Sequence, residues 1–238
     1  MARAIPIRAA IFLLAAGLFF TIFRADLTQW EWSGGGFVLV NPQVSIPAAP
    51  LRNAELNSDG INEQIIFRSG SVQIQSGREI LWSSPAQWQV RQAQIADLDR
   101  DGRLDLTLLV WRPFAAWPID AFLPAGGRIA GFHDAQNKSC HIILIGWKQG
   151  NFRELWAGSA LAEPILDFYA ADWNGDGRQE LMAVETTYDQ PTRGKALSLW
   201  EWNGFGFSLI GRLRTGIGKY AFLTGTDDRP SILVDQTK

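Results

Sequence analysis

The sequence predicts an all-β protein: a small β-propeller of about four blades, closed by pairing of its N- and C-terminal strands and preceded by one N-terminal hydrophobic helix. Three observations predict this fold class: a repeated acidic loop that leads into an apolar strand, a repeated aromatic hairpin, and the alternation of the two along the chain. The composition agrees, because 23 Gly, 11 Trp and 14 Phe against 2 Met are typical of a β protein rich in turns and aromatic residues.

The acidic loops share the pattern acid-x-[Asn/Asp]-x-Asp-Gly-x-x-acid, and a β-type apolar run follows each of them. They are loop 1 (residues 55–63, ELNSDGINE), loop 2 (97–105, DLDRDGRLD) and loop 3 (172–180, DWNGDGRQE). A fourth, eroded copy, GTDDRPSILV, starts at Gly225. It keeps the apolar strand but has lost the acidic spacing.

The second repeated element is aromatic. The segment QWEWSGGGFVLV (29–40) aligns with LWEWNGFGFSLI (199–210), and looser copies cover residues 144–156 and 71–82. Each copy is two alternating segments around a polar turn that contains Gly, which predicts a β-hairpin. Glycine and asparagine supply the positive φ that such turns require.

Hairpin, acidic loop and strand follow one another in a fixed order. Asp101 follows Asp59 by 42 residues, about the length of one four-stranded blade. Asp176 follows Asp101 by 75 residues, which predicts an insertion, placed at 111–140 because this stretch is rich in Pro, Gly and aromatic residues. The chain opens with a hairpin that lacks a loop and closes with a loop and strand that lack a hairpin, so the two ends together would complete one blade. An open array of four units and two chains completing a larger ring are the alternatives.

The acidic loops predict bound Ca²⁺, because a hard cation takes several oxygen ligands and alternate side chains of a tight loop converge on one point. The alternative for any single loop is an exposed Asp-Gly turn without an ion, and three copies at equivalent places favour the ion. The expected side-chain ligands are Glu55, Asn57, Asp59 and Glu63 in loop 1, Asp97, Asp99, Asp101 and Asp105 in loop 2, and Asp172, Asn174, Asp176 and Glu180 in loop 3. The expected carbonyl ligands are those of Ile61, Arg103 and Arg178.

The expected role of the ion is structural rather than catalytic. The loops place ligands at their first, third and fifth positions and Gly at the sixth, as an EF-hand loop does. Their last acid stands at the ninth position instead of the twelfth, and a strand follows instead of a helix, which argues against an EF-hand. Such a loop holds neighbouring strands together, and the charge of the ion offsets the cost of placing carboxylates beside the core.

With these loops and the Gly-Phe hairpins, residues 29–238 resemble FG-GAP/VCBS-type repeats of integrin-α-like β-propellers. The resemblance implies structural calcium in the loops. It also implies an exported, surface or periplasmic module for adhesion and interaction. The chain departs from the family pattern in its few repeats, its eroded last loop and its long insert.

The N-terminus predicts a targeting segment. Arg3 and Arg8 precede the apolar run 9–23, and Arg24 closes it. The run is short for a full span, which takes about 20 residues. An uncleaved anchor, a cleaved signal peptide and a buried soluble helix are the three interpretations, and the first two place residues 26–238 outside the cytoplasm. The predicted domains are therefore 1–25, an anchor or signal, and 26–238, the β domain.

Composition and motifs exclude several function classes. The net charge of −2 argues against a nucleic-acid binder. The single cysteine, Cys140, rules out an intramolecular disulfide and a zinc cluster built on cysteine. His133 and His141 flank it, and loop and strand-edge roles are expected for them. The sequence contains no nucleophile elbow, phosphate loop or His-Glu-x-x-His motif.

The favoured function is a non-enzymatic, calcium-stabilised interaction or scaffold module, held to the outer face of the cytoplasmic membrane and suited to be an accessory subunit of a membrane complex. The expected partner-binding residues lie in the insert: Trp111, Phe114, Trp117 and Phe122. Most hairpin tryptophans are expected in the core. The alternative is a carbohydrate-binding module or polysaccharide-active enzyme that uses exposed Trp and carboxylates. A half-ring that dimerises is a third hypothesis.

Overall fold

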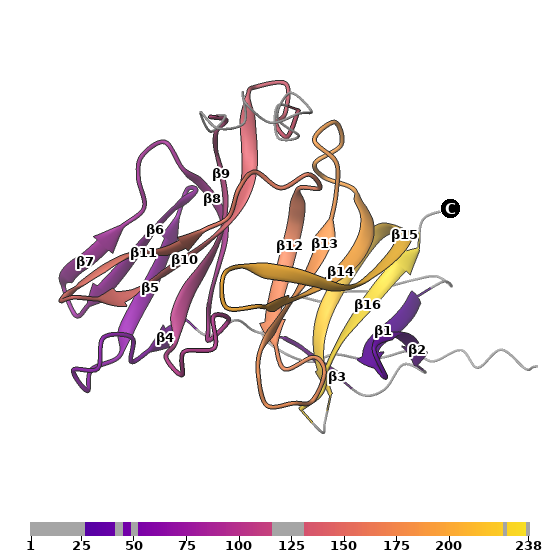
Figure 1. Ribbon diagram of the computed structural model, residues 1–238, viewed down its shortest axis with the longest axis horizontal. Coiled ribbons are helices and arrows are strands. Elements are labelled where there is room, and N and C mark those ends of the chain that lie inside the picture. Colours follow the sequence, from indigo (N-terminus) through magenta and orange to yellow (C-terminus); the bar gives the residue numbers. More distant parts are fainter. Residues whose placement is uncertain (1–26, 41–44, 49–51, 116–130, 226–227, 237–238) are drawn as a thin grey trace, which may run out of the picture.

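The computed structural model describes residues 27–40, 45–48, 52–115, 131–225 and 228–236, and these ranges contain strands and turns but no helix (Figure 1). The strands are β1 (Leu27–Ser33), β2 (Gly36–Val40), β3 (Ser45–Pro47), β4 (Asn53–Ala54), β5 (Glu63–Arg68), β6 (Ser71–Ser76), β7 (Glu79–Ser83), β8 (Gln89–Ala96), β9 (Asp105–Pro113), β10 (Lys138–Lys148), β11 (Asn151–Ala157), β12 (Ile165–Ala171), β13 (Glu180–Glu185), β14 (Gly194–Trp202), β15 (Phe207–Gly225) and β16 (Pro230–Gln236). The all-β prediction is confirmed.

The strands form three separate antiparallel sheets. The first sheet has the order β4-β5-β6-β7, and the second has the order β11-β10-β9-β8. The third has eight strands in the order β12-β13-β14-β15-β16-β1-β2, with β3 paired to β15. Figure 1 shows the first sheet at one end, the second in the middle and the third at the other end.

The prediction of a closed four-bladed β-propeller is wrong. The physical reason lies in β15, which is 19 residues long. It pairs with β14 along its first half and with β16 along its second half, so the third and the expected fourth units merge into one continuous sheet. Strands β1 and β16 do pair, over Leu27–Trp30 and Ile232–Asp235, but they extend this open sheet instead of closing a ring.

The predicted N-terminal hydrophobic helix falls on residues 1–25. This segment lies outside the described residues, and within the described ranges the structure contains no helix. The described residues form no helix of the length and hydropathy that a membrane span requires, so the predicted transmembrane helix has no counterpart among them.

All four predicted hairpins are confirmed, as β1–β2, β6–β7, β10–β11 and β14–β15. In three of them a Trp and a Phe stand opposite each other next to the turn and meet edge to face. The ring centroids are 5.3 Å apart for Trp32–Phe37, 5.0 Å for Trp147–Phe152 and 5.3 Å for Trp202–Phe207. The aromatic repeat in the sequence is thus a repeated cross-strand pair, the unit that stabilises hairpins.

The core lies between neighbouring sheets, and β9 contributes to both sides of the second sheet. Leu108 and Val110 pack toward the first sheet, while Leu109 and Trp111 pack toward the third. A strand that is covered on both faces has a nearly continuous apolar sequence. This explains why the segment LTLLVW at 106–111 does not alternate between apolar and polar residues.

The predicted insertion is shorter than its expected bounds. Strand β9 extends to Pro113 and β10 begins at Lys138, so only residues 114–137 connect regular strands. Of these, residues 116–130 lie outside the described ranges.

Candidate metal centre

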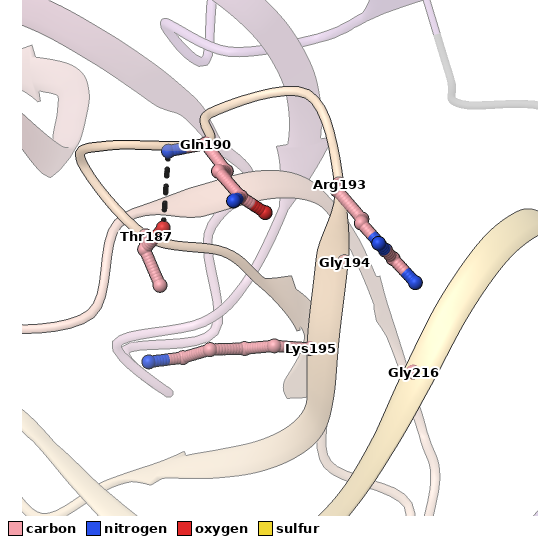
Figure 2. Close-up of a pocket in the computed structure, with 6 residues that line it drawn as sticks. All are labelled: Thr187, Gln190, Arg193, Gly194, Lys195 and Gly216. Carbon is pink, nitrogen blue, oxygen red and sulfur yellow. Dashed lines mark hydrogen bonds between the residues drawn. The ribbon is translucent and has the colours of Figure 1, made fainter. Parts of the chain in front are cut away.

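One cavity, of about 230 Å³, lies beside the turn between β13 and β14 (Figure 2). Its lining residues are Thr187, Gln190, Arg193, Gly194, Lys195 and Gly216. The ammonium of Lys195 already pairs with the carboxylate of Glu163. The lining offers no carboxylate, histidine or thiol, so it lacks an acid–base pair and a nucleophile of the kind that catalysis requires. The acidic loops lie elsewhere and form the better candidate site.

The three acidic loops share one backbone conformation. Their fourth residues all have positive φ: 66° for Ser58, 62° for Arg100 and 79° for Gly175. The sixth residue is Gly in each, with φ of 84° at Gly60, 83° at Gly102 and 83° at Gly177. The sequence repeat therefore reflects a structural repeat, including the left-handed fourth position, which the sequence pattern does not reveal.

Hydrogen bonds repeat in the same way. The first acid of each loop accepts the N–H of the sixth residue, from Gly60 to Glu55, from Gly102 to Asp97 (3.1 Å) and from Gly177 to Asp172 (2.8 Å). The fifth residue accepts the N–H of the seventh, from Ile61 to Asp59 (2.8 Å), from Arg103 to Asp101 (2.8 Å) and from Arg178 to Asp176 (2.9 Å). These bonds fix the side chains of the first and fifth residues against the backbone of their own loop.

The ninth residue of each loop is the first residue of the following strand and is buried. Glu63 begins β5, Asp105 begins β9 and Glu180 begins β13, with exposed fractions of 0%, 3% and 0%. A buried carboxylate is costly unless a donor or a cation compensates for its charge. The three loops differ in what supplies this compensation.

In loop 1, Glu63 is compensated by neutral donors. Its Oε2 accepts the N–H of Leu56 at 2.8 Å, and its Oε1 accepts the side-chain amide of Asn57 at 3.0 Å. Burial, and then the neighbouring Asp59 and Glu55, still raise the pKa of Glu63. Loop 1 therefore keeps an excess of negative charge.

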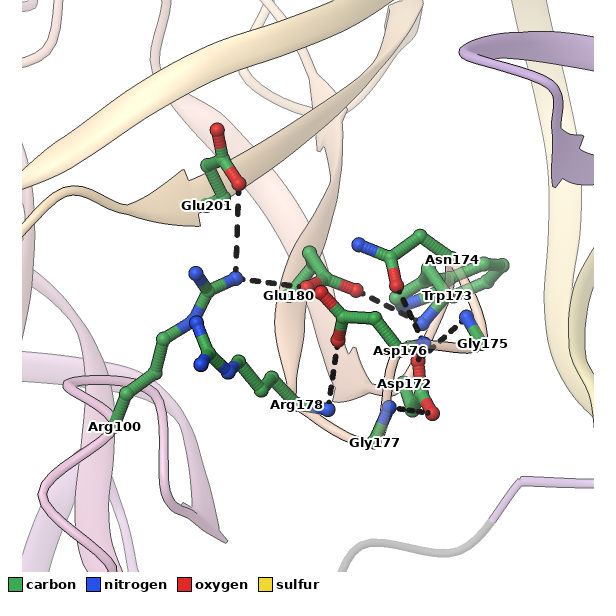
Figure 3. A network of polar contacts seen from close by, with 10 residues as sticks. All are labelled: Arg100, Asp172, Trp173, Asn174, Gly175, Asp176, Gly177, Arg178, Glu180 and Glu201. Carbon is green, nitrogen blue, oxygen red and sulfur yellow. Dashed lines mark hydrogen bonds and ion pairs between the residues drawn. The ribbon is translucent and has the colours of Figure 1, made fainter.

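In loop 3, Glu180 is compensated by a charged donor from another sheet (Figure 3). Its Oε2 accepts the N–H of Trp173 at 3.1 Å, and its Oε1 accepts Nη2 of Arg100 at 2.9 Å. Burial raises the pKa of Glu180 to about 7, and Arg100 opposes that rise.

In loop 2, Asp105 has no such partner. Aspartate is one methylene shorter than glutamate, and its buried Oδ2 has no hydrogen-bond partner; neither has the buried Oδ1 of Asp97. Burial, and after it the carboxylates of Asp99, Asp101 and Asp97, raise the pKa of Asp105 to about 8, and the charge of Arg103 opposes that rise. Loop 2 thus holds four carboxyl groups, and two of their buried oxygens have no hydrogen-bond donor. A cation would interact with both of these oxygens.

The structure brings together most of the predicted ligands of loops 1 and 2. Ligand oxygens of Glu55, Asp59 and Glu63 lie within 4.8 Å of one another, and so do those of Asp97, Asp99 and Asp101. Among the described residues, the acids of loop 3 do not form such a group. The carbonyls of Ile61, Arg103 and Arg178 stay predicted ligands.

The predicted partner-binding residues do not share one exposed surface. Trp111 is completely buried in β9, where the guanidinium of Arg91 lies 4.0 Å from its ring centroid. Phe114 is half-buried against the ring of His133, at 5.0 Å between centroids. Trp117 and Phe122 lie outside the described residues. Every described tryptophan is buried or half-buried, so the exposed Trp that the carbohydrate alternative needs is not found among them.

A Ser–His contact that the sequence did not predict lies inside the second sheet. His141 Nδ1 lies 2.9 Å from the carbonyl of Gly158, and because a carbonyl can only accept, Nδ1 carries the proton. The neutral ring then accepts the hydroxyl of Ser139 at Nε2, at 2.7 Å. Exposed fractions of 0% for Ser139 and 5% for His141 close this pair off from a substrate, so its role is structural.

Comparison with protein-family models, with curated proteins and with solved structures found no match for this chain. The resemblance to FG-GAP/VCBS-type repeats therefore stays a prediction based on the loops and hairpins.

Proposed function

We propose that this protein is a calcium-stabilised, non-enzymatic β module that works outside the cytoplasm by binding another protein. The observation that carries the calcium proposal is the buried Oδ2 of Asp105, which has no hydrogen-bond partner and lies beside three further carboxylates. Oxygen-only ligand sets of this kind suit Ca²⁺ rather than zinc or copper. The carboxyl groups of Asp97, Asp99, Asp101 and Asp105 and the carbonyl of Arg103 would hold the ion, which would supply the missing positive charge.

Loop 1 is the second proposed calcium site, with Glu55, Asp59 and Glu63 as its acidic ligands. The apolar segment 9–23 behind Arg3 and Arg8 supports export of the domain. Extracellular calcium would then be available to keep the sites filled.

The proposed mode of action is binding to another protein. Phe205 supports an interaction role, since its side chain is 89% exposed in the turn between β14 and β15. Exposed aromatic side chains of this kind anchor protein interfaces.

Calorimetric titration of the purified full chain with Ca²⁺ tests the calcium proposal. Asp101→Asn should remove one bound ion, and the control Asp189→Asn, at an exposed position outside the loops, should not. Absence of heat that saturates at a defined stoichiometry would contradict the proposal. Thermal unfolding in excess EGTA gives a second readout, because an ion that binds only the native state at 100 times its Kd stabilises by about 2.7 kcal/mol.

Affinity purification of the tagged full chain from its native source tests the interaction role. A stoichiometric protein partner that is lost on Phe205→Ser would support it. A chain that purifies alone and binds oligosaccharides would favour the carbohydrate alternative.

A further inference from the structure

The three acidic loops have one backbone structure but differ in how they compensate for their buried ninth residue. Loop 3 has the same left-handed fourth and sixth positions as loops 1 and 2. It also has a completely buried ninth acid, Glu180. Its backbone conformation alone therefore gives no reason for it to bind a cation less well than the other two.

The compensating charge of loop 3 comes from the second sheet. Arg100, the fourth residue of loop 2, sends its guanidinium across the boundary between the sheets, where Nη2 lies 2.9 Å from Glu180 Oε1 and 3.7 Å from Glu201 Oε2 (Figure 3). The side chain of Arg100 is only 16% exposed. A guanidinium stays charged at any physiological pH, so the positive charge beside Glu180 is permanent.

The distribution of acidic oxygens agrees with this difference. Loops 1 and 2 each bring three acidic ligands to within 4.8 Å of one another, whereas the described acids of loop 3 do not meet in this way. We propose that loop 3 holds no metal ion, and that the guanidinium of Arg100 takes the place of the cation there.

The residue at the fourth position explains why loop 2 can supply the compensating charge of loop 3. In loop 1 this position holds Ser58, whose side chain is too short to leave its own loop, and in loop 3 it holds Gly175, which has no side chain. In loop 2 it holds Arg100, which adopts a φ of 62° that non-glycine residues seldom take. Because Asp99 and Asp101 flank Arg100, a cation in loop 2 would hold the backbone that presents the guanidinium to Glu180. This last step rests on the proposed calcium function; the pairing of Arg100 with Glu180 does not.

The number of bound calcium ions tests the inference on the full chain. Asp176→Asn in loop 3 should leave the number unchanged. Arg100→Ser, which copies the fourth residue of loop 1 and so suits the backbone, should add one ion. Combining the two substitutions should remove this added ion. The control Arg100→Lys keeps the charge and should add none.

Two results would overturn the inference. One is loss of an ion on Asp176→Asn in the otherwise unchanged chain, because loop 3 would then hold a metal. The other is an unchanged number of ions on Arg100→Ser.

A double-mutant cycle in EDTA tests the pair without calcium. Arg100→Ser and Glu180→Gln should each lower the melting temperature, and the double variant should melt no lower than the less stable single variant. Additive falls would show that the two side chains act independently and would overturn the inference. If the unchanged chain binds no calcium, the proposed function fails, whereas this cycle still decides the role of Arg100.

Discussion

The side chain of Gln94 pairs with the backbone of Ala170 as a neighbouring strand would. Its Nε2 donates to the carbonyl of Ala170 at 2.8 Å, and its Oε1 accepts the N–H of the same residue at 3.0 Å. Gln92 makes the same two contacts with Phe168. Two glutamine side chains of β8 thus bind the backbone N–H and carbonyl groups along the free edge of β12. They join the second sheet to the third without a continuous ladder of backbone hydrogen bonds.

Replacing Gln94 should therefore weaken the junction between these two sheets. Gln94→Ala removes both hydrogen bonds and leaves buried backbone groups of Ala170 without partners, which should cost about 2 to 3 kcal/mol of unfolding free energy. Urea unfolding of the unchanged chain and of the variant measures this loss of unfolding free energy. Gln75→Ala is the matched control, because Gln75 binds only another side chain, that of Gln73, and should cost well under 1 kcal/mol. Equal losses in the two variants would contradict the role of Gln94.

Asp105→Asn should act in opposite directions with and without calcium. Without the ion, the substitution removes a buried carboxyl group that lies among three other acids, and about 2 kcal/mol of recovered stability would raise the melting temperature by roughly 5 °C. With the ion, it removes a ligand, so the rise in melting temperature that calcium causes should shrink. Differential scanning calorimetry in EGTA and in excess Ca²⁺ checks both signs. An unchanged calcium-induced rise would exclude Asp105 as a ligand.

The contribution of His141 to the stability of the fold should fall at mildly acidic pH. Burial lowers the pKa of His141 from the usual 6.5 to about 4. Between these two values the unfolded chain binds a proton at this ring that the native chain does not bind. The contribution of His141 to the unfolding free energy therefore falls as the pH falls, by about 1.4 kcal/mol per pH unit. The unfolding free energy of the unchanged chain minus that of His141→Gln should therefore be about 2 kcal/mol smaller at pH 5 than at pH 7. Urea unfolding of both chains at the two pH values measures this difference. A difference that does not depend on pH would contradict this assignment.

Cys140 should be unreactive in the native protein. Its side chain is completely buried in β10, and burial raises the pKa of the thiol to about 12, so almost no nucleophilic thiolate forms at neutral pH. Ellman's reagent should titrate one thiol per chain rapidly in urea and only slowly in native buffer. Equal rates in the two solutions would mean that β10 is not packed as described.

Local features of the structure were predictable from the sequence because they depend on residues that are close in the chain. The turn residues and alternating apolar positions predicted all four hairpins. The acid and glycine spacing predicted three equivalent loops, each followed by a strand. The bounds of the insertion were less accurate, because apolar residues at its ends, such as Trp111, extend a strand instead of a loop.

The sequence by itself thus determined an all-β chain with repeated hairpins and acidic loops, since period-two patterns and turn chemistry act over a few residues. Only the tertiary structure decided how the units assemble. The long strand β15 joins two expected units into one open sheet, and its two sets of partners come from distant parts of the chain. Tertiary structure also decided what each buried acid contacts: Arg100 reaches Glu180 from 80 positions away, whereas the buried Oδ2 of Asp105 has no hydrogen-bond partner. Because such contacts depend on how separate sheets pack, no local pattern in the sequence could reveal them.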